Sequence, residues 1–151
     1  MHQSITNFTN IQNSIKENQE KTNNKNNIKI IAVSKTFEIS HINPLIEYGH
    51  TDFGENKVQE AIEKWSDIKI KNQNLSLHLV GKLQSNKTKL ALKIFDYIHS
   101  LDSEKLANKI SEEQKKIDKK PKLFIQVNIG NENQKSGVSP NKLKSFYKYC
   151  L

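Results

Sequence analysis

Ile-Ile-Ala-Val-Ser-Lys-Thr at residues 30–36 is a short apolar run that ends in a lysine and then turns polar. An unbroken run of apolar, largely β-branched residues is typical of a strand buried on both faces, as in a parallel sheet. In α/β folds, binding and catalytic groups gather at the carboxyl ends of such strands. The segment therefore predicts a parallel α/β fold and marks Lys35 as the first candidate functional residue.

The chemistry predicted for Lys35 depends on how far its amine is removed from water. At the end of a buried strand a lysine is partly desolvated, and a desolvated amine can condense with an aldehyde to form a Schiff base. The structural alternative is a side chain that merely extends from the strand end into solvent. The strand pattern alone leaves both interpretations open.

Helical and strand patterns alternate along the rest of the chain. The spacing of apolar residues and the placement of Gly49, Ser103 and Ser139 as caps predict an opening helix followed by five βα units. Such alternation implies a parallel sheet, either an open flavodoxin-like sheet or part of a TIM barrel, which needs eight units over about 250 residues. Helices are expected from 5 to the polar stretch at 21–27, at 38–48, 57–68, 86–94 and 103–117, and from 140 onward; strands are expected at 28–34, 52–54, 75–80, 97–100 and 122–129.

Composition limits the classes of protein to consider. The 151 residues fit one domain, and 34% are hydrophobic, with a mean hydropathy of −0.74. All 24 basic residues are lysines, and the net charge is +8. Nucleic-acid sites usually combine clustered arginines with aromatic residues or a reading motif, and neither pattern is visible here. We therefore expect a lysine-rich solvated surface and no nucleic-acid partner.

Cysteine usage and hydropathy indicate the cellular setting. The single cysteine, Cys150, provides neither a disulfide framework nor a thiolate metal cluster. No apolar stretch approaches the roughly 20 residues that span a bilayer, and residues 1–10 lack the apolar core of a signal peptide. We expect a cytoplasmic protein without a membrane partner.

Four segments, each at or just after the end of an expected strand, together resemble the pyridoxal phosphate homeostasis proteins of the YggS/PROSC type. Each motif is weak by itself, but their order and intervals are specific, and the resemblance covers about residues 28–138. The segments are Ala32-Val33-Ser34-Lys35-Thr36, Phe53-Gly54-Glu55-Asn56, the ten residues from His78 to Lys87, and Gln126-Val127-Asn128-Ile129 with Lys135-Ser136-Gly137.

The resemblance implies the barrel fold of the alanine racemase N-terminal domain and a pyridoxal 5′-phosphate cofactor held as a Schiff base on Lys35. It further implies a non-catalytic role in intracellular homeostasis of this cofactor, with apoenzymes that depend on it as recipients. Asn56 either hydrogen-bonds the cofactor or caps the helix expected at residue 57. The alternatives are a racemase-like enzyme, which would need a second acid/base, and a basic nucleic-acid-binding domain.

The remaining polar residues near the strand ends have both structural and functional interpretations. His78 is more simply a structural histidine of a buried strand, and Lys135 a solvated loop charge. The polar residues of 84–87 either line the rim of the sheet or cap the next helix. His99 and Asp102 could suggest metal ligands, but a third ligand of suitable spacing is lacking, so no metal is expected.

The sequence departs from the family pattern at its end. In barrels of this kind the cofactor phosphate is usually held by loops after the last two strands, and residues 1–151 contain no glycine-rich or serine-rich loop of that type. The fold class expected is thus α/β, a partial TIM-like barrel of one helix plus about five βα units, in which residues 1–151 form an incomplete cofactor-binding domain. Its first and last units should expose sheet edges and apolar flanks.

Overall fold

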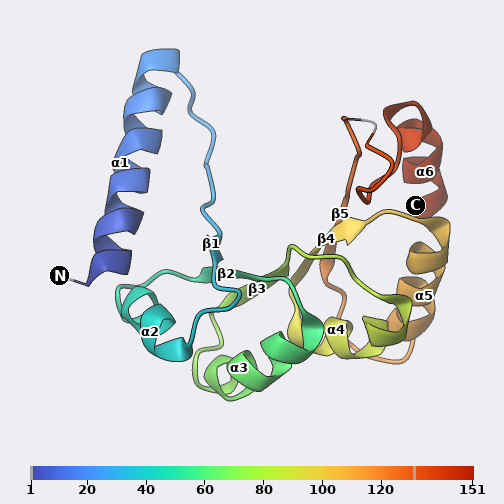
Figure 1. Cartoon of the computed structure of the whole chain (residues 1–151), viewed down its shortest axis with the longest axis horizontal. Coiled ribbons are helices and arrows are strands. Elements are labelled where there is room, and N and C mark those ends of the chain that lie inside the picture. Colours follow the sequence, from blue (N-terminus) through green and yellow to red (C-terminus); the bar gives the residue numbers. More distant parts are fainter. Residues whose placement is uncertain (1, 131) are drawn as a thin grey trace.

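The computed structural model describes residues 2–130 and 132–151. One long helix precedes five βα units, as the sequence predicted (Figure 1). The elements are α1 (Gln3–Thr22), β1 (Ala32–Val33), α2 (Ile39–Glu47), β2 (Asp52–Glu55), α3 (Val58–Lys71), β3 (Ser76–Leu79), the 3-10 helix η1 (Ser85–Lys87), α4 (Thr88–Ile94), β4 (Tyr97–Leu101), α5 (Glu104–Gln114), β5 (Lys122–Ile125), the 3-10 helix η2 (Pro140–Lys142) and α6 (Leu143–Cys150).

The five strands form one parallel sheet in the order β1-β2-β3-β4-β5. Each strand therefore lies beside its predecessor, whereas a flavodoxin-like sheet would place β2 outside β1. The sequential order decides between the two architectures that periodicity had left open. The prediction of a partial TIM-like α/β barrel is confirmed.

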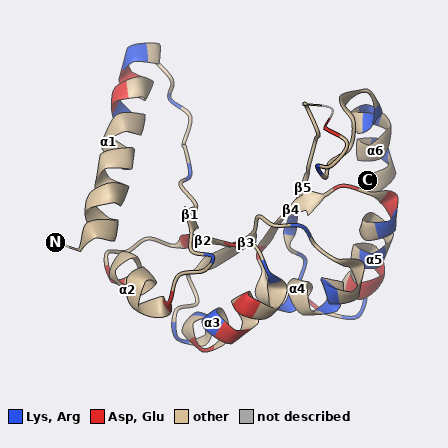
Figure 2. Cartoon of the chain, in the orientation of Figure 1, with Lys and Arg blue, Asp and Glu red and all other residues tan. Residues whose placement is uncertain are grey.

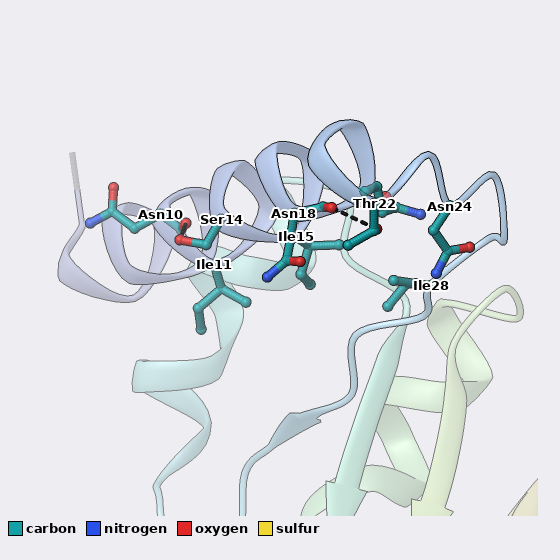
Figure 3. Close-up of a pocket in the computed structure, with 9 residues that line it drawn as sticks. Asn10, Ile11, Ser14, Ile15, Asn18, Thr22, Asn24 and Ile28 are labelled. Carbon is teal, nitrogen blue, oxygen red and sulfur yellow. Dashed lines mark hydrogen bonds between the residues drawn. The ribbon is translucent and has the colours of Figure 1, made fainter.

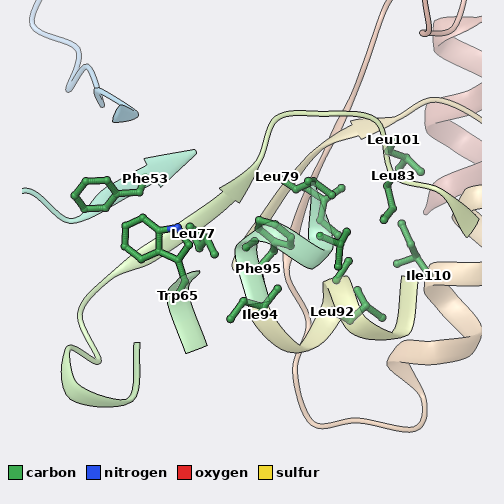
Figure 4. Packing of buried hydrophobic residues seen from close by; sticks show 14 of the residues in the cluster. Phe53, Trp65, Leu77, Leu79, Leu83, Leu92, Ile94, Phe95, Leu101 and Ile110 are labelled. Carbon is green, nitrogen blue, oxygen red and sulfur yellow. The ribbon is translucent and has the colours of Figure 1, made fainter. Parts of the chain in front are cut away.

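The helices cover one face of this sheet. α2 to α5 follow its outer side, and α1 and α6 stand at its two ends (Figure 1). Strand residues that point outward, such as Phe53, Leu77 and Leu79, pack with Trp65 of α3 and Phe95 at the end of α4 (Figure 4). All five side chains are at most 1% exposed. The hydrophobic core thus lies between the sheet and its helices.

Local capping follows the sequence signals in most places. The Ser103 hydroxyl accepts a hydrogen bond from Leu106 N and caps α5, as predicted. Gly49, directly after α2, has a φ of +98°, the left-handed conformation expected of a glycine at this place. Ser139 precedes η2, but its hydroxyl donates to the side chain of Asn141 instead of capping the backbone. Pro44 lies inside α2 and not near its start.

The first strand differs from its prediction. Only Ala32 and Val33 of the expected strand 28–34 pair with β2, and Val33 is 46% exposed. β1 is not buried on both faces because it is an edge strand, with a neighbour on one side only and no cover on the face away from the helices. β5, at the other edge, also ends early, at Ile125, and its Phe124 is 50% exposed. The expected exposure of both edge units is thus confirmed.

Candidate functional site

The carboxyl ends of the five parallel strands meet at one edge of the sheet. Lys35 follows β1 and Asn56 follows β2, and the pairing of Val33 with Gly54 places these two strand ends side by side. The pairing of Glu55 with Leu79 brings the segment after β3 beside Asn56. The strand ends that precede the two residues predicted as the cofactor site are therefore neighbours at this edge.

Lys35 lies in the turn between β1 and α2 and is exposed to solvent. The partial desolvation expected for a lysine at the end of a buried strand is not found, because the edge strand leading to it is itself half-exposed. Lys35 thus offers an accessible amine. Its backbone surroundings, by contrast, are held firmly.

One buried carboxylate fixes the residue before Lys35. The side chain of Glu55, at the end of β2, is fully buried, and its Oε1 accepts hydrogen bonds from Ser34 Oγ at 2.8 Å and Trp65 Nε1 at 2.9 Å. Lys64 Nζ completes the arrangement at 3.0 Å from the same oxygen. The other oxygen, Oε2, is buried without a partner among the described residues, so Oε1 accepts the hydrogen bonds of this carboxylate.

A second carboxylate fixes the residue after Lys35. Thr36 N–H donates to Glu60 Oε1 at 2.8 Å. This hydrogen bond is the main cause that holds the pKa of Glu60 below its ordinary value; partial burial opposes it, and Lys64 adds to it. Thr36 has a φ of +63°, in the left-handed region that β-branched residues rarely adopt. Lys64 also donates to the carbonyl of Ser34 at 2.9 Å, so both neighbours of Lys35 are tied to α3.

Asn56 borders a cavity of about 480 Å³ between the segments that follow β2 and β3. Its amide has no hydrogen-bond partner among the described residues, and it does not cap α3, which begins at Val58 after Lys57. A Cβ on Gly81 would lie 2.3 Å from the Asn56 carbonyl oxygen, so the two loops approach as closely as a glycine allows. The capping alternative for Asn56 is therefore wrong, and its amide remains available to a ligand.

The polar residues after β3 belong to the same cavity. Gln84 and Lys87 line it with Lys82, and the side chain of Gln84 makes no capping hydrogen bond to η1. For Gln84 and Lys87 the structure thus favours the rim position over the capping role. Asn86 lies within η1, outside this lining.

The loop after β5 forms a separate polar cavity of about 320 Å³ near Lys82. Its lysine, Lys135, is exposed and forms an ion pair with Glu132 of the same loop at 2.8 Å. Asn128 holds the loop through its side-chain amide, which donates to the carbonyl of Glu132 at 2.9 Å. Lys135 is thus a solvated loop charge, as the sequence favoured.

The inner face of the sheet, opposite the helices, carries a polar network that sequence reasoning missed. Asp52 Oδ1 lies 2.9 Å from Lys29 Nζ and 3.0 Å from His78 Nε2, and His78 Nδ1 lies 2.9 Å from His99 Nε2. His78 also stacks on the ring of Tyr97. Asp52, His78 and His99 lie on three adjacent strands, and only Tyr97 and His99, two residues apart on β4, carried a sequence signal that they share one face. His78 is a structural histidine, as expected.

Burial shapes the ionisation of this network. It lowers the pKa of His78, although the hydrogen bond that His78 donates to Asp52 acts in the opposite direction. It also lowers the pKa of His99, together with the neighbouring His78. For Asp52 burial opposes ionisation, but hydrogen bonds from Lys29 and His78 outweigh it and leave its pKa below the ordinary value. Both histidines therefore favour the neutral form.

Metal ligands are not assembled in the described residues, 2–130 and 132–151, where no group of three or more His, Cys, Asp or Glu side chains is placed to hold an ion. His99, one of the two residues considered as ligands, is instead hydrogen-bonded to His78. Likewise, none of the described helices is long and apolar enough to cross a bilayer.

A further cavity, of about 460 Å³, lies between α1 and the segment that leads into β1 (Figure 3). It is lined by Ile11 and Ile15 of α1 and by Ile28, together with polar side chains. Ile28 precedes β1, so this cavity lies toward the amino end of the strand, away from Lys35. It takes no part in the candidate site.

The charge distribution does not single out a basic face. Acidic and basic positions alternate along α3 and α5 (Figure 2). Several of them are paired, as in Lys64 with Glu60 and Lys109 with Glu113. The net positive charge is therefore spread over a mixed surface.

The described residues fit one end of an aldehyde cofactor. Lys35 provides an accessible amine, and Asn56 provides an amide beside a cavity that Gly81 also lines. A dedicated phosphate-binding loop is not found among these residues. The fit therefore concerns the carbonyl and ring of such a molecule.

Comparisons with known proteins agree with this geometry. Residues 7–151 match the family described as the alanine racemase N-terminal domain. A pyridoxal phosphate homeostasis protein of Haemophilus influenzae is 41% identical over 132 residues, which cover 87% of this chain and 55% of that protein. The protein of the same name from Aquifex aeolicus is 35% identical, covering 84% of this chain and 55% of the relative. The chain thus spans about half the length of these relatives.

A solved structure gives the same result. PipY from Synechococcus elongatus, a member of the COG0325 family determined with PLP bound, matches with a TM-score of 0.72 at 34% identity. The match covers 87% of this chain and 61% of PipY. The family resemblance predicted from the four sequence segments is confirmed.

Proposed function

Because this chain belongs to the alanine racemase N-terminal domain family and is similar to pyridoxal phosphate homeostasis proteins, we propose that it binds pyridoxal 5′-phosphate through Lys35. The binding serves supply and buffering of this cofactor in the cytoplasm, with apoenzymes that depend on it as recipients. The observation that carries the proposal is an exposed amine in a turn whose two neighbouring residues are both fixed by buried or half-buried side chains.

The residues of the carboxyl edge would divide the work of binding. When bound, the cofactor supplies an aldehyde that can be joined reversibly to an amine. Lys35 would hold the carbonyl end of the cofactor through its accessible side-chain amine. Asn56 offers both a donor and an acceptor to polar groups at the ring.

The proposed role is carriage and not catalysis. Racemisation requires a second acid/base on the opposite side of the reacting carbon. His78 and His99, on the inner face of the sheet, are hydrogen-bonded to each other, and His78 is also bonded to Asp52. This arrangement supports a holding function for the described part of the chain.

Reductive trapping tests the proposal. The protein is mixed with pyridoxal phosphate, reduced with borohydride and digested, and the labelled peptides are mapped by mass spectrometry. We expect the label mainly on Lys35 and its loss in Lys35→Ala, while Lys135→Ala, the matched change at another exposed lysine of the same edge, leaves the labelling of Lys35 intact. A label spread evenly over many lysines, and unchanged in Lys35→Ala, would overturn the proposal.

A further inference from the structure

The turn that carries Lys35 is fixed on both sides while the amine itself is free. Ser34, before it, is only 4% exposed, and the exposed Thr36, after it, is anchored through its backbone N–H. The Ser34 anchor leads to β2 and α3, and the Thr36 anchor leads to α3. The backbone on both sides of Lys35 is therefore held by residues of other elements.

Glu55 is the centre of the first anchor. Three donors converge on its Oε1: the Ser34 hydroxyl just after β1, the indole of Trp65 and the ammonium of Lys64. Burying a carboxylate costs free energy unless it is paired, so the folded chain must keep donors at Glu55. It fixes the direction in which the chain leaves β1.

Lys64 links the two anchors. Its ammonium has three N–H donors, and it lies within 3.0 Å of Glu55 Oε1, 2.9 Å of the Ser34 carbonyl and 3.2 Å of Glu60 Oε1. All three directions are thus used, and its side chain is only 11% exposed. One α3 side chain holds both the strand end and the carboxylate that anchors Thr36.

Thr36 shows that the anchors work against a local preference. A β-branched residue in the left-handed region is strained, and such conformations persist only where the surroundings enforce them. The hydrogen bond from Thr36 N–H to Glu60 acts here together with the turn that Phe37 N–H closes on the Ser34 carbonyl. Removing the Glu60 carboxylate takes away the acceptor of Thr36 N–H and loosens this turn.

From these contacts we infer that Glu60, Lys64 and Glu55 are positioning residues for Lys35, so that α3 determines how readily the amine reacts. The inference rests on the proposed function and extends it, because a pre-oriented amine loses less freedom on bond formation. Glu60 is the residue to test, since its side chain is 30% exposed and its removal does not open the core.

The experiment measures the rate at which pyridoxal phosphate and borohydride label Lys35, relative to Lys135 in the same sample. We expect Glu60→Ala to lower this ratio about tenfold, whereas Glu60→Gln, which keeps an oxygen acceptor for Thr36 N–H, retains it. Glu63→Ala is the matched control, because Glu63 is an exposed glutamate of the same helix whose side chain accepts a hydrogen bond from Gln59. Its ratio should equal that of the wild type.

Emission of Trp65, the single tryptophan, monitors the fold in each variant, since its indole donates to Glu55. The possible outcomes separate the two claims. An unselective wild type would refute Lys35 as the binding residue. A selective wild type whose ratio persists in Glu60→Ala, or falls equally in Glu60→Gln or Glu63→Ala, would refute the positioning role alone.

Discussion

The turn after β1 and the loop after β5 each present an exposed lysine at the carboxyl edge of the sheet, yet their surroundings differ. The Lys35 turn is tied to β2 and α3 through the buried carboxylate of Glu55. Lys135 pairs with Glu132 of its own loop, in a contact exposed on both sides. Exposure and strand-end position are thus shared, and only the anchoring differs.

A strand-end lysine thus becomes a candidate binding residue when its neighbouring residues are hydrogen-bonded to buried side chains of other elements. An exposed ion pair such as that of Lys135 adds little stability. A buried, multiply hydrogen-bonded carboxylate instead holds the backbone in one arrangement. The following predictions test the contrast between the two regions.

The largest effect is expected from removing the two carboxylates. Glu55→Ala leaves the Lys64 ammonium without its buried partner and should lower the free energy of unfolding by about 3–5 kcal/mol. Glu132→Ala removes an exposed pair and should change it by at most about 1 kcal/mol. Urea denaturation followed by Trp65 emission and circular dichroism measures both. Equal losses would show that the two regions are anchored alike.

A smaller effect is expected from adding a methyl group at two glycines. Gly81→Ala should cost about 1–3 kcal/mol, because its Cβ would meet the Asn56 backbone at 2.3 Å and the loops must separate. Gly130→Ala should be nearly neutral, since its Cβ would meet only the flexible side chain of Glu132, at 3.1 Å. Thermal denaturation distinguishes them. A neutral Gly81→Ala would mean that the loops beside Asn56 are loose.

Acid should weaken the middle of the sheet, through the inner-face histidines of β3 and β4. Burial lowers the pKa of His78 and of His99, so the unfolded chain binds more protons and stability falls as the pH drops below the unfolded value of about 6.5. The denaturation midpoint should therefore decline from about pH 7.5 to about pH 5.5.

His99→Gln should reduce the slope of this decline, whereas His41→Gln, a matched change at an exposed histidine of α2, should not. Denaturant midpoints measured across the pH range provide the comparison. A decline that is the same in all three proteins would assign the pH dependence to other groups.

The smallest effect is expected at the backbone of the two regions. The loop after β5 uses Gly137, with a φ of +123°, where the turn after β1 uses Thr36. Thr36→Gly should change the free energy of unfolding by less than about 1 kcal/mol, because relief of strain opposes the greater freedom of glycine in the unfolded chain. Urea denaturation measures it, and a loss above about 2 kcal/mol would contradict this balance.

The order of elements was predictable from the sequence because it depends on local periodicity. The alternation of helical and strand patterns predicted five βα units, and the cap at Ser103 was predicted from residue type alone. The expected burial of the strand at 28–34 was wrong, because burial depends on what lies beside and above a strand. Neighbours in a sheet are not encoded in the strand's own residues.

The candidate site was predictable only in part. Lys35 was found from its place at a strand end and Asn56 through the family resemblance, and the structure places the two strand ends side by side. The positioning residues were missed, since Glu60 and Lys64 are spaced as an ordinary ion pair on a helix surface. The sequence offered no sign that they reach back to the preceding turn.

The sequence by itself determined the number and order of the βα units and supplied two lysines at strand ends. Only the tertiary structure decided which of them has fixed neighbours. The reason is that the contacts of Ser34 and Thr36 with Glu55, Glu60 and Lys64 join residues separated by 21 to 30 positions. Such contacts form only when the sheet and α3 pack together.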